Sequence, residues 1–449
     1  MKLILILLFS INIYAFEQPN VQNLNWNGLD VAYLEDNQTP TYDIIMYFAD
    51  GALSDKTQKG VSKWMFSNLD IGTNRYSRNE INDSLEFYGA SWGPYVSHEY
   101  TTYHLSGLYK DIKPTLKKIC HLFNDATFPN KELVKQKRLT KNSLQNIVNS
   151  PAAIIQKAFR EISLAQTPYR YPVNGKLKDF KRITRQKLLR KLKYFNKEVY
   201  KKIYIRSPKG IKSIASIFNE DCHWNGSSKY KRNKVFQKSK FKHKITLVTV
   251  PKANQARVMI GRYLNFPANR NGALDNLSTQ ILGDGGFSSM LMQKLRVEHG
   301  LTYGASSSIG YQKNYGRVII STFTKNENII KLLNLLNKVI DDAKKGNFSK
   351  DYLENSKNAL IGSFPFKFEN KNRYLQQLLF LDHQGESYDY LTTYQDKVSK
   401  FNSSDVTNKL KFILDSNKIE TVILGPKSLY KVLKKEFGKV SVIDYKRFL

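Results

Sequence analysis

Residues 282–307 read L-G-D-G-G-F-S-S-M-L-M-Q-K-L-R-V-E-H-G-L-T-Y-G-A-S-S, a pattern that predicts a glycine loop, a short helix and a strand. Three glycines permit a positive φ or a close backbone approach in the loop, namely Gly283, Gly285 and Gly286. Ser288 or Ser289 can cap the helix that follows, and Leu291 and Leu295 share one apolar face of it.

The same stretch contains a helix end and the start of a strand. Gly300 stands where a left-handed C-cap belongs, with His299 in the last turn. Leu301, Tyr303 and Ala305 then alternate, and we expect them on one face of a strand.

Arg296, near the helix end, and Tyr303, just inside the expected strand, can point into the same corner. A guanidinium beside a phenol is suited to holding a carbonyl group or an oxyanion. The alternative is that Arg296 forms a surface ion pair and Tyr303 fills the core. The local sequence alone favours this alternative.

The composition is that of an ordinary globular protein with a large positive charge. The 449 residues are 41% hydrophobic with a net charge of +33, and a chain of this length predicts roughly two to four domains. Nucleic acid is the first partner that such a charge suggests, but the lysines are spread along the chain. We therefore expect no nucleic-acid partner, whereas acidic substrates or an anionic membrane surface fit the charge.

The first residues resemble a secretory signal peptide. Lys2 precedes an apolar run over residues 3–14, and residues 13–15 (I-Y-A) form a small-residue cleavage site. We therefore expect residues 1–15 to be cleaved and the mature chain to be periplasmic or secreted. No later run of about twenty apolar residues follows, so we expect a soluble chain without a membrane span.

Two cysteines, Cys120 and Cys222, could form one disulfide in an oxidising compartment. They could equally be two buried small apolar side chains, and the sequence leaves both alternatives open.

The expected strands occur in the same order twice. In residues 16–224 they lie within 27–33, 42–48, 90–96 and 100–108 and from 203 onward; in residues 245–449 they lie at 245–250, 255–263, 306–311, 316–324 and 421–425. Helical patterns separate them, and the basic run at 225–244 is expected to be a solvated linker. We interpret this order as an internal duplication, which gives an α+β fold of two α/β half-domains.

Several motifs in this order resemble the pitrilysin (insulinase) family of zinc metallopeptidases. They are N-G-L at 27–29, G-V-S-K-W-M-F-S-N-L-D-I-G-T at 60–73, Y-T-T-Y at 100–103, A-T-F-P at 126–129, Q-T-P-Y at 166–169 and F-S-S-M-L-M-Q-K-L-R-V-E-H-G-L-T-Y at 287–303. The resemblance covers nearly the whole mature chain. It implies that family's fold, in which mixed or antiparallel sheets are covered by helices.

The resemblance also implies roles for the second-half motif. Arg296 and Tyr303 stand at the family's spacing for the pair that holds the substrate at the scissile bond, which makes them the candidate catalytic residues. Gly285, Gly286 and Phe287 are the candidate substrate-binding residues.

The zinc motif of the family is degenerate in this chain. Where the family has two histidine ligands and a general-base glutamate, residues Lys63, Phe66 and Ser67 stand here. The third ligand should fall at Asn142 or Ser143, and no acidic residue lies between positions 132 and 161. We therefore expect no metal in this chain.

Other metal donors are weak candidates. His98 and His104, with Glu99 beside the first, are too far apart on a strand to bind one ion. Asp221-Cys222-His223 (residues 221–223) is a compact donor cluster but lacks the paired spacing of zinc sites.

The resemblance implies a subunit of a two-chain enzyme, in which a homologous partner supplies Zn²⁺ and the general base. This chain would contribute Arg296 and Tyr303 to a heterodimer that degrades or processes peptides, and it would be inactive alone. Two alternatives stay open, a catalytically inactive scaffold and a stand-alone chaperone that binds peptides or polyanions.

Overall fold

The computed structural model describes residues 19–165, 167–224, 244–265, 271–368 and 370–449. The expected signal peptide and the expected linker lie outside these residues, except for Lys244, which is the first residue of a strand. Within the described part of the chain, no helix is both long and apolar enough to cross a bilayer.

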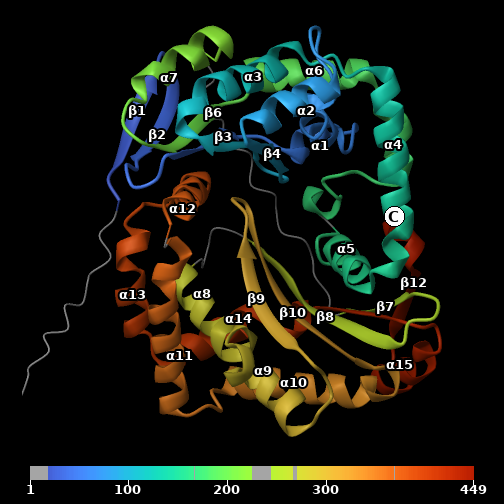
Figure 1. Ribbon diagram of the computed structural model, residues 1–449. Coiled ribbons are helices and arrows are strands. Elements are labelled where there is room, and N and C mark those ends of the chain that lie inside the picture. Colours follow the sequence, from blue (N-terminus) through green and yellow to red (C-terminus); the bar gives the residue numbers. More distant parts are fainter. Residues whose placement is uncertain (1–18, 166, 225–243, 266–270, 369) are drawn as a thin grey trace, which may run out of the picture.

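Two six-stranded mixed sheets form the framework, one from each half of the chain (Figure 1). The first has the strand order β1-β2-β6-β3-β5-β4 and the second has the order β12-β7-β11-β8-β10-β9. The strands of the first sheet are β1 Val21–Trp26, β2 Leu29–Glu35, β3 Thr41–Phe48, β4 Ser91–Val96, β5 Thr101–Leu108 and β6 Lys201–Ser207. Those of the second are β7 Lys244–Thr249, β8 Gln255–Asn265, β9 Ala305–Tyr311, β10 Tyr315–Lys325, β11 Glu420–Gly425 and β12 Val440–Asp444.

Five strands of each sheet share one arrangement, and the sixth differs, because β1 is antiparallel to β2 whereas β12 is parallel to β7. In the shared arrangement a parallel pair, β2 with β6 or β7 with β11, is followed by antiparallel neighbours that end in an edge hairpin. The hairpins are β4–β5 and β9–β10. The predicted α+β fold of two similar halves is therefore confirmed.

Helices cover the sheets. The first half contains α1 Val61–Phe66, α2 Arg78–Phe87, α3 Ile112–Asp125, α4 Asn130–Gln145, α5 Pro151–Ser163, α6 Arg185–Lys197 and α7 Lys212–Ser216. The second contains α8 Gly272–Thr279, α9 Met290–Met292, α10 Ile329–Lys345, α11 Lys350–Ser363, α12 Lys371–Gln384, α13 Tyr390–Lys400, α14 Ser403–Ile413 and α15 Leu429–Phe437. Helix α3 illustrates why they pack: Leu116, Ile119 and Phe123 recur at helical spacing and are fully buried against the first sheet.

Each half also lends one helix to the other (Figure 1). Helix α5 comes from the first half but packs on β8 and β11, where Ile155 and Phe159 join a core with Met259. Helix α12 comes from the second half but packs on β6 of the first sheet, where Asp382 accepts a hydrogen bond from the Tyr204 hydroxyl. This reciprocal exchange of helices joins the two halves.

Candidate functional site

The glycine loop is held against the start of β9. Residues Gln280–Asp284 form a π-helical turn, and a Cβ atom added to Gly283 would lie 2.4 Å from the backbone nitrogen of Ser307. Gly283 therefore allows a contact that no side chain would permit, whereas Gly286 supplies a positive φ of 59°. Gly285 has an ordinary negative φ.

The predicted helix forms, but it is short and largely π-helical. The Ser289 hydroxyl accepts a hydrogen bond from the backbone N–H of Met292 at 3.4 Å, so the second of the two candidate serines is the cap. Helix α9 continues as a π-helical segment, Gln293–Glu298, and the two leucines of the predicted apolar face are both buried. Gly300 follows with a φ of 60°, as predicted for the C-cap.

Tyr303 lies outside the strand, and the prediction that placed it there is wrong. Strand β9 begins only at Ala305. The Thr302 hydroxyl accepts a hydrogen bond from the backbone N–H of Gly304 at 3.1 Å and so forms a local turn. The turn delays the strand and directs Tyr303 to solvent, where 77% of its surface is exposed. The alternative of a core tyrosine is therefore wrong as well.

Arg296 and Tyr303 are brought together, through the backbone of the tyrosine. Nη1 of Arg296 donates to the carbonyl oxygen of Tyr303 at 2.7 Å, and the guanidinium lies 4.5 Å from the centroid of the Phe287 ring. The Phe287 side chain is 59% exposed. We call these three residues the Arg–Tyr surface. It presents a phenol, an aromatic face and part of a guanidinium to solvent.

The three degenerate zinc-motif positions lie on α1 or at its end and are packed very differently. The Phe66 ring is buried, with its centroid 4.8 Å from that of Phe195 and 5.3 Å from that of Phe48. Lys63 is half-buried, and burial lowers the pKa of its ammonium. Ser67 is exposed.

These positions do not fit a zinc ion, because an ammonium, a phenyl ring and a hydroxyl do not make a ligand set. Asn142 and Ser143, where the third ligand was expected, are exposed on α4. Across the described ranges, no group of three or more His, Cys, Asp or Glu side chains is placed to hold a metal ion.

The remaining metal candidates have other partners. His98 Nε2 lies 2.8 Å from a backbone carbonyl oxygen, and His104 Nε2 lies 3.4 Å from a carboxylate oxygen of Asp43. Cys222 is bonded to Cys120, with 4.4 Å between their Cα atoms. Of the two alternatives that the sequence left open for the cysteines, the structure contains the disulfide.

Glu99 has a structural role that the sequence did not indicate. Its buried carboxylate accepts hydrogen bonds from the Tyr169 hydroxyl at 2.5 Å, the backbone N–H of Lys313 at 2.6 Å and the Asn314 side chain at 2.8 Å, and lies 3.3 Å from Nε2 of His383. Burial alone would raise the pKa of Glu99, but the hydrogen bonds from His383 and Tyr169 outweigh it and lower that pKa. The tips of the two edge hairpins therefore meet at one carboxylate.

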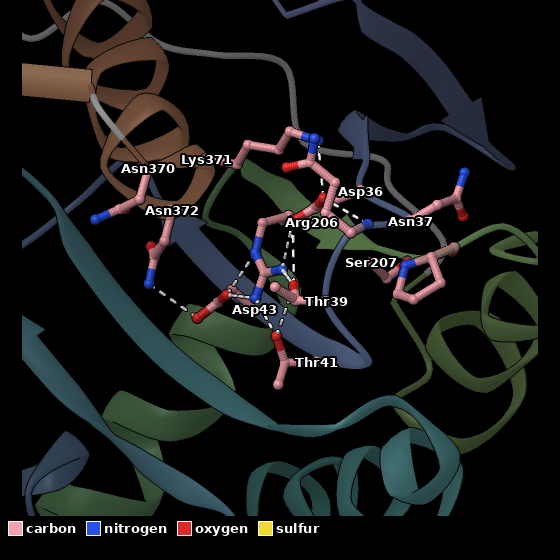
Figure 2. Close-up of polar contacts among 12 residues, drawn as sticks. Asp36, Asn37, Thr39, Thr41, Asp43, Arg206, Ser207, Asn370, Lys371 and Asn372 are labelled. Carbon is pink, nitrogen blue, oxygen red and sulfur yellow. Dashed lines mark hydrogen bonds and ion pairs between the residues drawn. The ribbon is translucent and has the colours of Figure 1, made fainter.

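Arg206 lies at a second junction that was not predicted (Figure 2). Its guanidinium donates to Asp43 through both Nε and Nη2, and to Asp36 through Nη1 at 2.9 Å. Two residues at the start of α12 bind the same carboxylates, since Lys371 Nζ lies 2.8 Å from Asp36 and Asn372 Nδ2 lies 2.9 Å from Asp43. Both ends of α12 are thus attached to the first sheet.

Comparison with known families matches both halves of the chain. Residues 30–176 match the model described as insulinase (peptidase family M16), and residues 209–360 match the model described as peptidase M16 inactive domain. Together these two matches span about two thirds of the chain.

Individual proteins are similar to this chain over nearly its whole length. A Helicobacter pylori protein named non-peptidase homolog YmxG is 22% identical over 427 residues, which cover 90% of this chain and 94% of that protein. The crystal structure of a peptidase M16 inactive domain from Pseudomonas fluorescens has a TM-score of 0.81 at 22% identity and covers 91% of this chain and 98% of that one. The periplasmic protease PqqL of Escherichia coli has a TM-score of 0.72 at 14% identity, and this chain corresponds to 46% of its length.

At these identities the solved structures show the fold alone, while the family models match the motifs of both halves. The chain belongs to peptidase family M16, the insulinase family.

Proposed function

We propose that this chain is the substrate-positioning subunit of a two-chain zinc peptidase that acts on peptides outside the cytoplasm. The observation that carries the proposal is the contrast between two sites in one chain. The zinc-motif positions cannot hold the metal, whereas Arg296 and Tyr303 lie together on an accessible surface. In this proposal a homologous partner subunit provides the zinc ion and the general base.

The chemistry of the Arg–Tyr surface suits this role. One N–H of Arg296 is used to hold the Tyr303 backbone, which fixes the position of the guanidinium. The other donors of the planar fork and the phenol hydroxyl can then donate to a peptide carbonyl group, and donors fixed in advance stabilise the developing oxyanion. Phe287 adds an apolar face for the peptide beside them.

Two observations support export. The first residues have the pattern of a signal peptide, and the Cys120–Cys222 disulfide is a bond that persists in oxidising compartments. One similar fold belongs to a protein named as a periplasmic protease. In this proposal the enzyme acts in the periplasm or outside the cell.

The test is reconstitution. The tagged chain is purified with its partner, and cleavage of an unfolded peptide is compared for wild type, Arg296→Ala and Tyr303→Phe. Loss of an oxyanion donor lowers kcat by roughly 10²- to 10³-fold, so we expect losses of that order in both variants. Arg257→Ala is the matched control, because that guanidinium also stacks on a ring, Phe323, at 5.1 Å. Stoichiometric zinc in the isolated chain would contradict the proposal.

The second candidate function is an inactive scaffold. The observation that favours it is that Arg296 already has two intramolecular partners, the Tyr303 carbonyl group and the Phe287 ring. A scaffold predicts that Arg296→Ala leaves cleavage by the reconstituted pair unchanged.

A further inference from the structure

A pocket of about 450 Å³ lies between the first sheet and α12. Its sheet side is formed by Ile45 of β3 and by residues of the β4–β5 hairpin, including Tyr95 and Tyr100. Its helix side is formed by successive turns of α12, with Gln376, Gln377 and Phe380 facing the sheet residues. This volume is that of a typical ligand pocket, and β4 beside it is the edge strand of its sheet.

The walls of the pocket are fixed by the contacts at the two ends of α12. At its start Lys371 binds Asp36, and at its end His383 lies against Glu99 and its ring centroid is 4.4 Å from that of Tyr100. The helix therefore cannot shift away from the sheet without breaking partly buried polar contacts at its start or a buried one at its end. A pocket with such walls is formed before any ligand arrives, which lowers the entropy lost on binding.

The lining is neutral, although the chain is strongly basic. None of the residues that line this pocket is Lys, Arg, Asp or Glu, in a chain of 71 basic residues. The one imidazole among them, His104, has its Nε2 within 3.4 Å of Asp43. A charged ligand group would thus lose hydration here without gaining an opposite charge, and an uncharged group is favoured.

The aromatic part of the lining is incompletely buried. Tyr95 is 57% exposed and Phe380 is 37% exposed, and the Tyr95 and Tyr100 ring centroids are 5.8 Å apart. Insertion of an apolar group would cover these rings. The carboxamides of Gln376 and Gln377 on the opposite wall both donate and accept hydrogen bonds, which matches the N–H and C=O of a peptide group.

We propose that this pocket binds one uncharged aromatic or aliphatic side chain of an extended peptide, with the two glutamine carboxamides bound to the adjoining backbone. The inference rests on the proposed function in taking a peptide as the ligand. It adds a second contact on the same chain, separate from the Arg–Tyr surface, and it gives the chain a preference for apolar residues despite its positive charge.

The test measures peptide binding to the purified full chain, without a partner subunit or metal. The probes are fluorescein-labelled, acetylated and amidated Gly/Ser heptapeptides with one central Phe, Leu, Asp or Lys, followed by fluorescence anisotropy. We expect the Phe and Leu peptides to bind at least tenfold more tightly than the Asp and Lys peptides. Equal binding of all four, no binding, or tightest binding of the Asp peptide with loss in salt would overturn the proposal.

Variants locate the site. Phe380→Ala should weaken binding of the Phe peptide at least tenfold, and Gln377→Trp, which fills the pocket from the other wall, should do the same. Phe87→Ala is the matched control, because that ring is 83% exposed on α2 and does not line the pocket. Unaltered melting temperatures establish that the variants fold, and wild-type affinity in Phe380→Ala and Gln377→Trp would overturn the assignment. Since this assay contains no catalysis, its failure is distinguishable from failure of the cleavage test at Arg296.

Discussion

The helical connection before the edge hairpin differs between the two halves, although five strands of each sheet share one arrangement. In the first half, α1 and α2 connect β3 to β4, and Phe66 of α1 is buried among other aromatic rings. In the second half, α8, α9 and the π-helical segments connect β8 to β9, and Arg296 lies beside the exposed Tyr303. One connection is part of a core at Phe66, and the other is accessible at Tyr303.

This difference shows that the first site is closed by packing and not only by loss of ligands. A position that held a general base would need access to water and substrate, whereas Phe66 is in contact with Phe48 and Phe195. Substitutions on α1 should therefore change stability, and substitutions on the Arg–Tyr surface should change activity.

The largest effect is expected when the zinc motif is restored by Lys63→His, Phe66→Glu and Ser67→His together. Removing a core Phe ring costs about 3–5 kcal/mol, and an unpaired buried carboxylate adds to this cost, so we expect a loss of more than about 4 kcal/mol in the free energy of unfolding. Urea unfolding followed by circular dichroism measures it. Ser67→His alone is the control and should lie within about 0.5 kcal/mol of wild type, because Ser67 is exposed. A stable triple variant with one bound zinc would contradict the conclusion that packing closes the first site.

Arg206→Met should produce the next largest effect, because it tests how the halves are joined. Removing one partner from a buried ionic cluster costs about 3–5 kcal/mol, since Asp36 and Asp43 would stay buried without the guanidinium. Lys209→Met is the control, as its ammonium is exposed and 3.9 Å from Glu35. If the two variants had equal urea midpoints, the cluster around Arg206 would not stabilise the fold.

The same cluster predicts a pH dependence. Burial alone would raise the pKa of Asp36 and Asp43, but hydrogen bonds from Lys371 to the first and from His104 and Arg206 to the second outweigh it and hold both pKa values below the ordinary 3.8. The stabilisation is therefore present above about pH 4 and is lost as the pH falls through the lowered values. Urea midpoints between pH 5 and pH 2 should fall more steeply for wild type than for Arg206→Met.

A smaller loss is expected from Cys120→Ser with Cys222→Ser, which removes the disulfide from the first half. The two cysteines are 102 residues apart, and loss of a native disulfide costs about 2–5 kcal/mol. Unfolding in urea with and without a reductant measures the change, and the double variant should not respond to the reductant. If reduction did not lower the free energy of unfolding of wild type, packing alone would stabilise the first half.

The smallest effect on stability is expected at the Arg–Tyr surface. Arg296→Ala and Tyr303→Phe should each lie within about 0.5 kcal/mol of wild type, because Tyr303 is exposed and the hydrogen bond that the half-buried Arg296 donates lies at the surface. Thermal unfolding measures this directly. A loss above about 2 kcal/mol would mean that Arg296 is structural, and this would support the inactive scaffold.

The regular elements could be predicted from the sequence because their residues alternate or repeat locally. The β10 strand, expected at 316–324, is Tyr315–Lys325, and its residues alternate between buried and partly buried. The edge strands β1 and β12 were not predicted, since neither has a fully buried face to impose a clear pattern. Tyr303 was misplaced because one hydroxyl, that of Thr302, forms a turn that a period of two does not reveal.

The contacts between the halves could not be predicted. Glu99 accepts a hydrogen bond from Asn314, which lies 215 residues away in the sequence, and Asp36 accepts one from Lys371, which lies 335 residues away. No local pattern marks such pairs, so a buried carboxylate that joins two hairpins looks like any surface glutamate in the sequence. That Arg296 and Tyr303 can reach the same corner was predictable because only seven positions separate them, but their contact through the Tyr303 backbone was not.

The exchange of α5 and α12 has a consequence for synthesis on the ribosome. Helix α5 is made before any strand of the sheet that it covers, and β6 is finished long before α12 emerges to cover it. The nascent first half therefore exposes both an apolar helix and an uncovered sheet face until the last quarter of the chain has been translated. We expect such a chain to need shielding by a chaperone while it grows, and secretion before folding would provide an unfolded chain in which both halves can close together.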